Sequence, residues 1–132
     1  MSEIRWGVMG AGTIAYRFAA ALEHVDSARL VAVSGRNAAR VAAFAEQHPV
    51  APGRCYVSEG DGGAAAHERL VADADVDAVY LALPHGLHAG WACKLLHAGK
   101  AVPCEKPAAL SEDEALRIAT AARVRARCSW RP

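Results

Sequence analysis

The chain has 132 residues, of which 53% are hydrophobic and 22% are charged, and its formal net charge is +1. This composition is typical of one globular domain with a packed core, and it excludes a disordered chain. The near-neutral charge does not indicate a nucleic acid or an anionic membrane as partner, and no spanning apolar run or signal peptide is evident. We therefore expect a cytoplasmic protein that binds no nucleic acid and no membrane.

The first stretch predicts a strand over residues 4–9 and a helix over 13–24. Gly10, Gly12 and Ala15 have the G-x-G-x-x-G/A spacing of a dinucleotide-binding strand–turn–helix. Gly10 allows the tight turn, Gly12 leaves room for a pyrophosphate, and Ala15 lets the helix pack closely on the strand. The alternative is a tight turn that binds no ligand.

The rest of the chain alternates between predicted strands and helices. Strands are expected over 28–33, 55–57, 77–83 and 101–104, and helices over 38–48, 64–72, 87–98 and 111–125. Asn37 would cap the helix over 38–48, Gly99 would end the helix over 87–98, and Ser111 with Glu114 forms a capping box. The apolar side of the helix over 38–48 would comprise residues 38, 41, 42, 44 and 45. The alternation predicts an α/β fold: a doubly wound parallel sheet with helices on both faces.

Four cysteines, at positions 55, 93, 104 and 128, are widely separated and form no C-x-x-C pair. Zinc and thioredoxin-like redox sites are therefore poor interpretations, and we expect no metal. Buried thiols are the simplest expectation for a reducing compartment.

The end of the second predicted strand indicates which nucleotide would bind. An NAD-binding fold places an acidic residue there to bind the ribose 2′-hydroxyl. This chain has Ser34, Gly35, Arg36 and Asn37 instead. A guanidinium pairs with a 2′-phosphate, which a carboxylate would repel. The sequence thus favours NADP over NAD as cofactor, with Ser34, Gly35 and Arg36 as candidate binding residues. Alternatively, Arg36 is a solvated loop cation.

Two further segments each contain a predicted strand and the residues that follow it: VDAVYLALPHGLH over 76–88 and AGKAVPCEKP over 98–107. With the glycine turn, they resemble the Gfo/Idh/MocA family of NAD(P)-dependent oxidoreductases over about residues 4–125. The histidine at position 85 and the Ser-Gly-Arg sequence look most like the NADP-using dihydrodiol dehydrogenase branch. The resemblance implies a Rossmann nucleotide-binding domain over 1–127.

The resemblance also implies roles for individual residues. The pyrophosphate would be held by Gly10, Gly12, Thr13 and Ile14. The nicotinamide side would be lined by Leu83, Pro84, His85 and His88. Glu105 and Lys106 would reach the nicotinamide ribose and the substrate, with Lys106 as the catalytic residue that helps to move a proton. From the residues alone, Lys106 could be solvated, and His85 or His88 could cap a helix.

The chain departs from the family at its end. Members continue into a large β domain that binds the substrate, and this chain ends Cys-Ser-Trp-Arg-Pro at 128–132. We interpret the chain as a truncated member, with 128–132 as an out-of-frame tail. A naturally short protein with a chance ending is the alternative. Truncation would expose a sheet edge and so allow self-association.

Two functions are therefore expected. The first is an NADP-dependent oxidoreductase, present as its cofactor domain, that transfers hydride to or from a small molecule such as a sugar, polyol or dihydrodiol. The second is a nucleotide-binding module without catalytic activity of its own. A methyltransferase is disfavoured because the second strand ends without an acidic residue and because the 84–88 and 105–107 motifs are present.

Overall fold

The computed structural model describes residues 4–26, 28–50, 52–83 and 85–102. Its centre is a parallel sheet of four strands in the order β3-β2-β1-β4. The strands are β1 (Ile4–Met9), β2 (Ala28–Gly35), β3 (Cys55–Val57) and β4 (Ala78–Leu81). The helices are α1 (Thr13–Leu22), α2 (Ala38–Gln47), α3 (Ala64–Val71) and α4 (His88–His97), with 3₁₀ turns η1 (Pro52–Arg54) and η2 (His85–Leu87).

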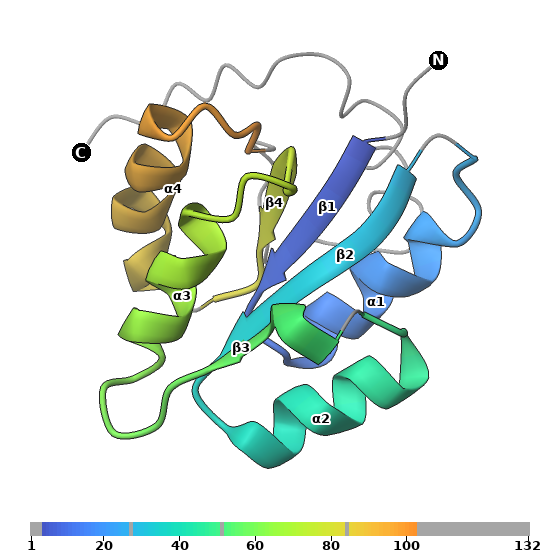
Figure 1. Ribbon diagram of the computed structural model, residues 1–132, viewed down its shortest axis with the longest axis horizontal. Coiled ribbons are helices and arrows are strands. Elements are labelled where there is room, and N and C mark those ends of the chain that lie inside the picture. Colours follow the sequence, from blue (N-terminus) through green and yellow to red (C-terminus); the bar gives the residue numbers. More distant parts are fainter. Residues whose placement is uncertain (1–3, 27, 51, 84, 103–132) are drawn as a thin grey trace.

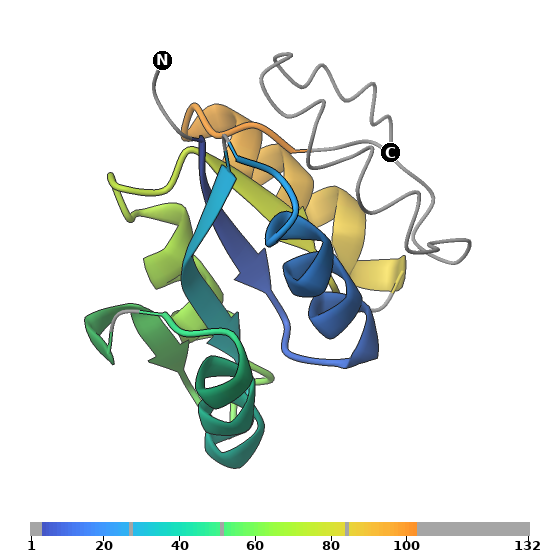
Figure 2. The same cartoon turned by 90° about the vertical axis from the view of Figure 1, so that its right-hand side faces the viewer.

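The helices cover both faces of the sheet, as Figures 1 and 2 show. On one face, α1 and α2 pack over Trp6, Val8 and Tyr80, and on the other α3 and α4 pack over Met9 and Val79. Because successive side chains of a strand point to opposite faces, each buried strand supplies both cores. The predicted doubly wound parallel fold is confirmed.

An aromatic stack fills the core beneath α1. The ring of Phe18 lies edge-on to Trp6, with a centroid distance of 4.8 Å, and is stacked on Tyr80 at 4.4 Å. All three side chains are buried. Burial of such large rings provides much of the driving force that fixes α1, and therefore the glycine turn before it, on the sheet.

Polar contacts join the beginnings of β1 and β4. Arg5 donates from Nε and from a terminal nitrogen to the two carboxylate oxygens of Asp77, both at 3.0 Å. This ion pair holds the pKa of Asp77 below its ordinary value, mainly through the hydrogen bond with Arg5. The ammonium of Lys100, only 7% exposed, donates to the carbonyl oxygens of Asp73 at 2.6 Å and Val76 at 2.9 Å. Asp77 and Lys100 belong to the two segments, 76–88 and 98–107, that resemble the family. Both residues thus also stabilise the fold.

Several boundaries differ from the sequence predictions. β2 continues two residues further than expected, to Gly35, and β4 is shorter than expected because it ends at Leu81. On α2, Val41 and Phe44 are buried, but Ala38 and Ala42 are exposed, so the apolar side is narrower than predicted.

Around the last predicted strand, Ala101 forms an isolated parallel bridge with Ala78. Pro103, the predicted helix over 111–125 and the 128–132 tail lie outside the described residues. None of the helices in the described part of the chain is long and apolar enough to cross a bilayer.

The two cysteines that the structure describes are not buried. Cys55 is half-buried and Cys93 is exposed on α4, so the expectation of buried thiols is wrong for this pair. Burial of the Cys55 side chain nevertheless raises its thiol pKa. Within the described residues, no group of histidine, cysteine, aspartate and glutamate side chains is arranged to hold a metal ion.

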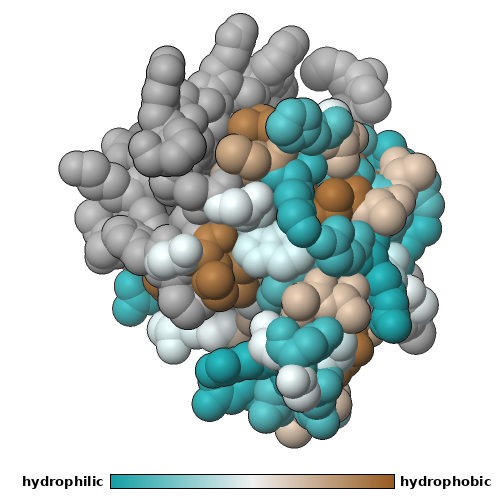
Figure 3. All heavy atoms as spheres, turned by 90° about the vertical axis from the view of Figure 1, so that its left-hand side faces the viewer, coloured by the Kyte–Doolittle hydropathy of each residue, from teal (hydrophilic) through white to brown (hydrophobic). Residues whose placement is uncertain are grey.

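The face over α3 and α4 presents hydrophilic side chains interspersed with small hydrophobic areas (Figure 3). Leu87, in η2, is an exposed large hydrophobic residue at 46%. Self-association through a sheet edge remains a prediction.

Candidate functional site

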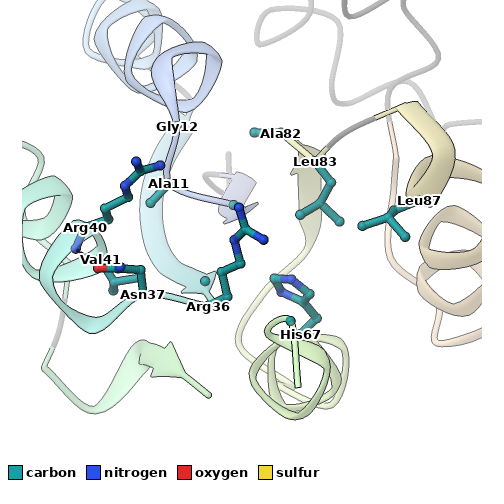
Figure 4. A pocket seen from close by; sticks show the side chains of 13 residues that line it. Ala11, Gly12, Arg36, Asn37, Arg40, Val41, His67, Ala82, Leu83 and Leu87 are labelled. Carbon is teal, nitrogen blue, oxygen red and sulfur yellow. Dashed lines mark hydrogen bonds between the residues drawn. The ribbon is translucent and has the colours of Figure 1, made fainter. Parts of the chain in front are cut away.

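A cleft of about 500 Å³ opens at the carboxyl ends of the strands. It lies between the turn after β1, the connection from β2 to α2, and the segment after β4, with α3 at one side (Figure 4). Ligands of open α/β sheets bind at this edge. The structure therefore brings together three segments that the sequence had marked independently as candidate binding segments.

The glycine turn is built as its spacing predicts. Gly10 has a φ of +102°, and a Cβ atom at this position would lie 2.7 Å from the carbonyl oxygen of Ala82. The amide nitrogen of Gly10 donates to the carbonyl oxygen of Ser34 at 2.7 Å. Gly10 is therefore required by the fold, because only glycine fits between the ends of β1, β2 and β4.

Gly12 is different, because the packing of the described residues does not require it. A Cβ atom here would have no described atom within 4 Å, and its φ of −94° is available to any residue. Gly12 lines the cleft and is the N-cap of α1. A glycine whose missing side chain opens space on the ligand side fits the close approach of a diphosphate.

The beginning of α1 is suited to an anion. Gly12 supplies no side-chain cap, and the first turn contains no acidic residue. The first amides of a helix lack partners within the helix, and Thr13 and Ile14 carry two of them. By contrast, α2 is capped twice: Asn37 Oδ1 accepts from the Arg40 amide at 3.0 Å, and Glu59 Oε2 accepts from the Ala38 amide at 2.9 Å. A diphosphate would accept hydrogen bonds from the first amides of α1, as the Asn37 and Glu59 side chains do for α2.

Two arginines line the cleft where the adenosine end of a dinucleotide would lie. Arg36 follows β2, as predicted, and Arg40 is in the first turn of α2. Figure 4 shows Arg40 extending toward the glycine turn and Arg36 standing between α2 and Leu83. Arg40 was not among the residues predicted from the sequence, although an arginine so soon after Arg36, at the start of a predicted helix, was a usable signal.

The other predicted residues near β2 differ in position. Gly35 lines the cleft, and a Cβ atom there would lie 2.7 Å from a methyl group of Val41. Ser34 is fully buried, and its hydroxyl oxygen lies 2.7 Å from Nδ1 of His67. The structure thus pairs Ser34 with a histidine on α3, and direct contact between Ser34 and a cofactor remains a prediction.

His67 lines the cleft and was not predicted from the sequence as a site residue. Its side chain is 3% exposed, lines the cleft, and lies edge-on to Trp91 at a centroid distance of 5.3 Å. Burial holds the pKa of His67 below its ordinary value, although the negative charge of Asp61 opposes this shift. The imidazole is therefore neutral at neutral pH.

The nicotinamide side of the site is described only in part. Leu83 lines the cleft, while His85 begins η2 and His88 is the first residue of α4. The predicted helix over 87–98 is confirmed within one residue at each end. Pro84, Glu105 and Lys106 lie outside the described residues.

Comparison with known proteins agrees with this geometry. The family model of Gfo/Idh/MocA oxidoreductases, described as having an NAD-binding Rossmann fold, matches residues 4–130. A 1,5-anhydro-D-fructose reductase from Ensifer adhaerens is 34% identical over 119 residues, or 90% of this chain and 33% of that protein. A human trans-1,2-dihydrobenzene-1,2-diol dehydrogenase is 32% identical over 125 residues, or 93% of this chain and 34% of that protein.

Solved structures show the same similarity. A 3-ketoreductase from Actinomadura kijaniata in complex with NADP superposes with a TM-score of 0.65 at 36% identity, covering 94% of this chain and 36% of that one. A biliverdin reductase from Synechocystis in complex with biliverdin and NADP+ superposes with a TM-score of 0.62 at 27% identity, covering 88% and 35%. The chain thus spans about a third of the length of its relatives.

Proposed function

Since the chain belongs to the Gfo/Idh/MocA family of oxidoreductases and forms its NAD(P)-binding Rossmann domain, we propose that it binds NADP(H) in the cleft between β1, β2 and β4. When bound, that cofactor supplies hydride transfer between its nicotinamide and an alcohol or carbonyl carbon. The residues of this chain bind and orient the cofactor.

The observation that carries the proposal is the contrast between Gly10 and Gly12. Packing explains Gly10, because a side chain there would collide with the Ala82 carbonyl oxygen. Packing of the described residues does not explain Gly12, which opens onto the cleft at the start of an α-helix without a side-chain cap. A diphosphate bound at Gly12 and the amides of Thr13 and Ile14 accounts for the open space at Gly12 and for the missing side-chain cap of α1.

The preference for NADP(H) rests on charge. Arg36 and Arg40 both line the cleft, and none of the described residues that line it carries a carboxylate. Two guanidinium groups suit a 2′-phosphate through charge-assisted hydrogen bonds. One observation favours NAD(H) as the second candidate: Glu59 reaches the first amide of α2, where its charge would oppose a phosphate.

On the nicotinamide side, we propose that Leu83, Pro84, His85 and His88 line the site. Glu105 and Lys106 would contact the nicotinamide ribose and the substrate. Lys106 would be the catalytic residue, because an ammonium beside a substrate hydroxyl lowers its pKa and helps to move its proton.

The substrate is proposed only by class. The relatives act on an anhydro sugar and on a dihydrodiol by name, so a sugar, polyol or dihydrodiol is the proposed small-molecule substrate. Because the chain spans about a third of those relatives, catalysis by the whole protein is a proposal too. The alternative is a nucleotide-binding module without turnover of its own.

Binding measurements on arginine variants test the cofactor proposal. Arg36→Ala and Arg40→Ala should each weaken NADPH binding about 10-fold or more, because each removes a charge-assisted hydrogen bond worth about 1.5–3 kcal/mol. Binding of NADH, which lacks the 2′-phosphate, should change little. Calorimetric titration of each variant with both nucleotides gives the two dissociation constants.

Arg69→Ala is the matched control, because Arg69 is an exposed arginine on α3 that does not line the cleft. This variant should bind NADPH as the unmodified chain does. Equal dissociation constants for NADPH and NADH in the unmodified chain would refute the NADP preference, and failure to bind either would refute the proposed function. Turnover with sugars, polyols and dihydrodiols then separates an active enzyme from a binding module.

A further inference from the structure

We propose that His67 recognises the adenine base of the bound dinucleotide, with its Nε2 atom hydrogen-bonded to the edge of the base that carries N1 and the 6-amino group. This inference rests on the proposed function. It adds a specificity-determining contact from α3, an element that neither the glycine motif nor the Arg36 argument involves.

The position of His67 is fixed on two sides. Its Nδ1 lies 2.7 Å from the buried hydroxyl oxygen of Ser34, and its ring packs edge-on against Trp91. The first turn of α3 is itself held in place, because Ser58 Oγ accepts from the Ala66 amide at 2.9 Å. A buried ring with this many constraints presents its second nitrogen in one direction, as a specific contact requires.

That second nitrogen is available to a ligand. Nε2 of His67 makes no hydrogen bond with the described residues, although the side chain is 97% buried and lines the cleft. Figure 4 shows the ring pointing into the space bordered by Arg36 and Leu83. Nε2 is therefore open to a molecule that enters the cleft, and a ligand with a matching polar group would replace water there.

The adjacent turn keeps this approach open. Gly63 has a φ of +89°, and a Cβ atom there would lie 3.0 Å from Nε2 of His67 and 3.3 Å from the backbone nitrogen of Arg36. Glycine at this position therefore leaves Nε2 uncovered and lets the turn pack against Arg36. A side chain at position 63 would fill the space beside both residues.

The geometry also selects the part of the nucleotide. Arg36 and Arg40 would hold the 2′-phosphate, and the base is attached to that same ribose through N9. The N1 and 6-amino edge lies farthest from the ribose, so it is the part of the base that would reach across from Arg36 to His67 on the α3 side of the cleft. A neutral imidazole suits this uncharged edge. Among the described residues, the buried Ser34 hydroxyl has only Nδ1 of His67 as a hydrogen-bond partner, so we assign the hydroxyl proton to that bond. The ring proton is then on Nε2, which would donate to N1 of the base.

Titration with base-modified cofactors tests the proposal. The hypoxanthine analogue of NADPH has a protonated N1 and a carbonyl in place of the amino group, so it reverses both hydrogen-bonding groups. The unmodified chain should bind NADPH at least 5-fold more tightly than this analogue. His67→Phe should bind NADPH at least 5-fold more weakly and should lose the discrimination, because phenylalanine keeps the ring but makes no hydrogen bond.

His97→Phe is the matched control, since His97 is an exposed histidine at the end of α4. His67→Gln provides a second test if His67→Phe does not fold, and it too should reduce the preference for adenine. A folded His67 variant that keeps both the affinity and the preference overturns this inference and leaves the proposed function intact. Failure of the unmodified chain to bind NADPH would refute the proposed function itself.

Discussion

At the scale of single residues, the glycine motif separates into a part that the fold needs and a part that a ligand needs. Gly10 combines a φ of +102° with a neighbouring carbonyl oxygen 2.7 Å from where its Cβ would be. Gly12 has an ordinary φ of −94° and open space in the same direction. The spacing alone could not distinguish them, because both are glycines two positions apart.

Alanine substitutions test this division. Gly10→Ala should lower the free energy of unfolding by about 2 kcal/mol or more, because it introduces a strained φ and a collision with backbone. Gly12→Ala should leave the free energy of unfolding unchanged or slightly raised, because alanine restricts the unfolded chain. Chemical denaturation of both variants measures these values.

Cofactor binding tests the second part of this division, the role of Gly12. Gly12→Ala should be a well-folded protein that binds NADPH at least 10-fold more weakly, since its methyl group occupies the space of the diphosphate. A Gly12→Ala variant that binds NADPH normally would show that the diphosphate does not lie there. A stable Gly10→Ala variant would contradict the role of Gly10 in the fold.

At the scale of elements, the sequence predicted the four strands and four helices of the described residues, because burial on both faces and capping residues are local signals. It did not predict which side chains meet across elements. Ser34 was predicted to bind the cofactor, and its contact with His67 was not predicted. Ser34 follows Val33, which points into the core under α1 and α2. Successive strand residues alternate, so Ser34 points toward α3 and meets His67.

Arg40 and His67 were missed for a related reason. Each lies on a helix, and its distance from the cleft depends on how the crossover connections place that helix. His67 did leave a weak signal, since it lies on α3 beside the buried Ala66 and three residues before the buried Leu70. Only the packed structure shows that this side of α3 reaches the cleft.

Asn37, the N-cap of α2, affects both the stability of the fold and the choice of cofactor, because it caps the helix and lines the cleft. Asn37→Ala removes the acceptor for the Arg40 amide and should cost about 1 kcal/mol of unfolding free energy. Asn37→Asp keeps an acceptor and should retain the stability, since a carboxylate suits a helix start. Denaturant midpoints at constant slope measure both effects.

The aspartate variant should nevertheless bind NADPH more weakly relative to NADH. Asn37 lines the cleft between Arg36 and Arg40, so a new carboxylate there would repel a 2′-phosphate. Unchanged selectivity in a stable Asn37→Asp variant would show that the phosphate lies elsewhere.

At the scale of the whole molecule, the residues that line the cleft are held in place by both hydrophobic cores of the sheet. The turn after β1 is fixed by the aromatic packing beneath α1, while His67 and Leu83 belong to the side packed under α3 and α4. A ligand that touches the glycine turn, α2 and α3 together would therefore connect the two halves of the fold. Its binding should stabilise the entire domain, because unfolding either core destroys the site.

Thermal unfolding measures this coupling. With NADPH at about 100 times its dissociation constant, the free energy of unfolding should rise by about 2.7 kcal/mol. For a chain of this size, that corresponds to an increase in Tm of roughly 10 °C. NADH at the same concentration should raise Tm less, because it binds more weakly without the 2′-phosphate. Gly12→Ala should unfold at the temperature of the unmodified chain without ligand. With the same NADPH concentration its Tm should rise by no more than about half as much, because 10-fold weaker binding leaves about 1.4 kcal/mol. An equal increase would mean that the nucleotide stabilises the fold from another site.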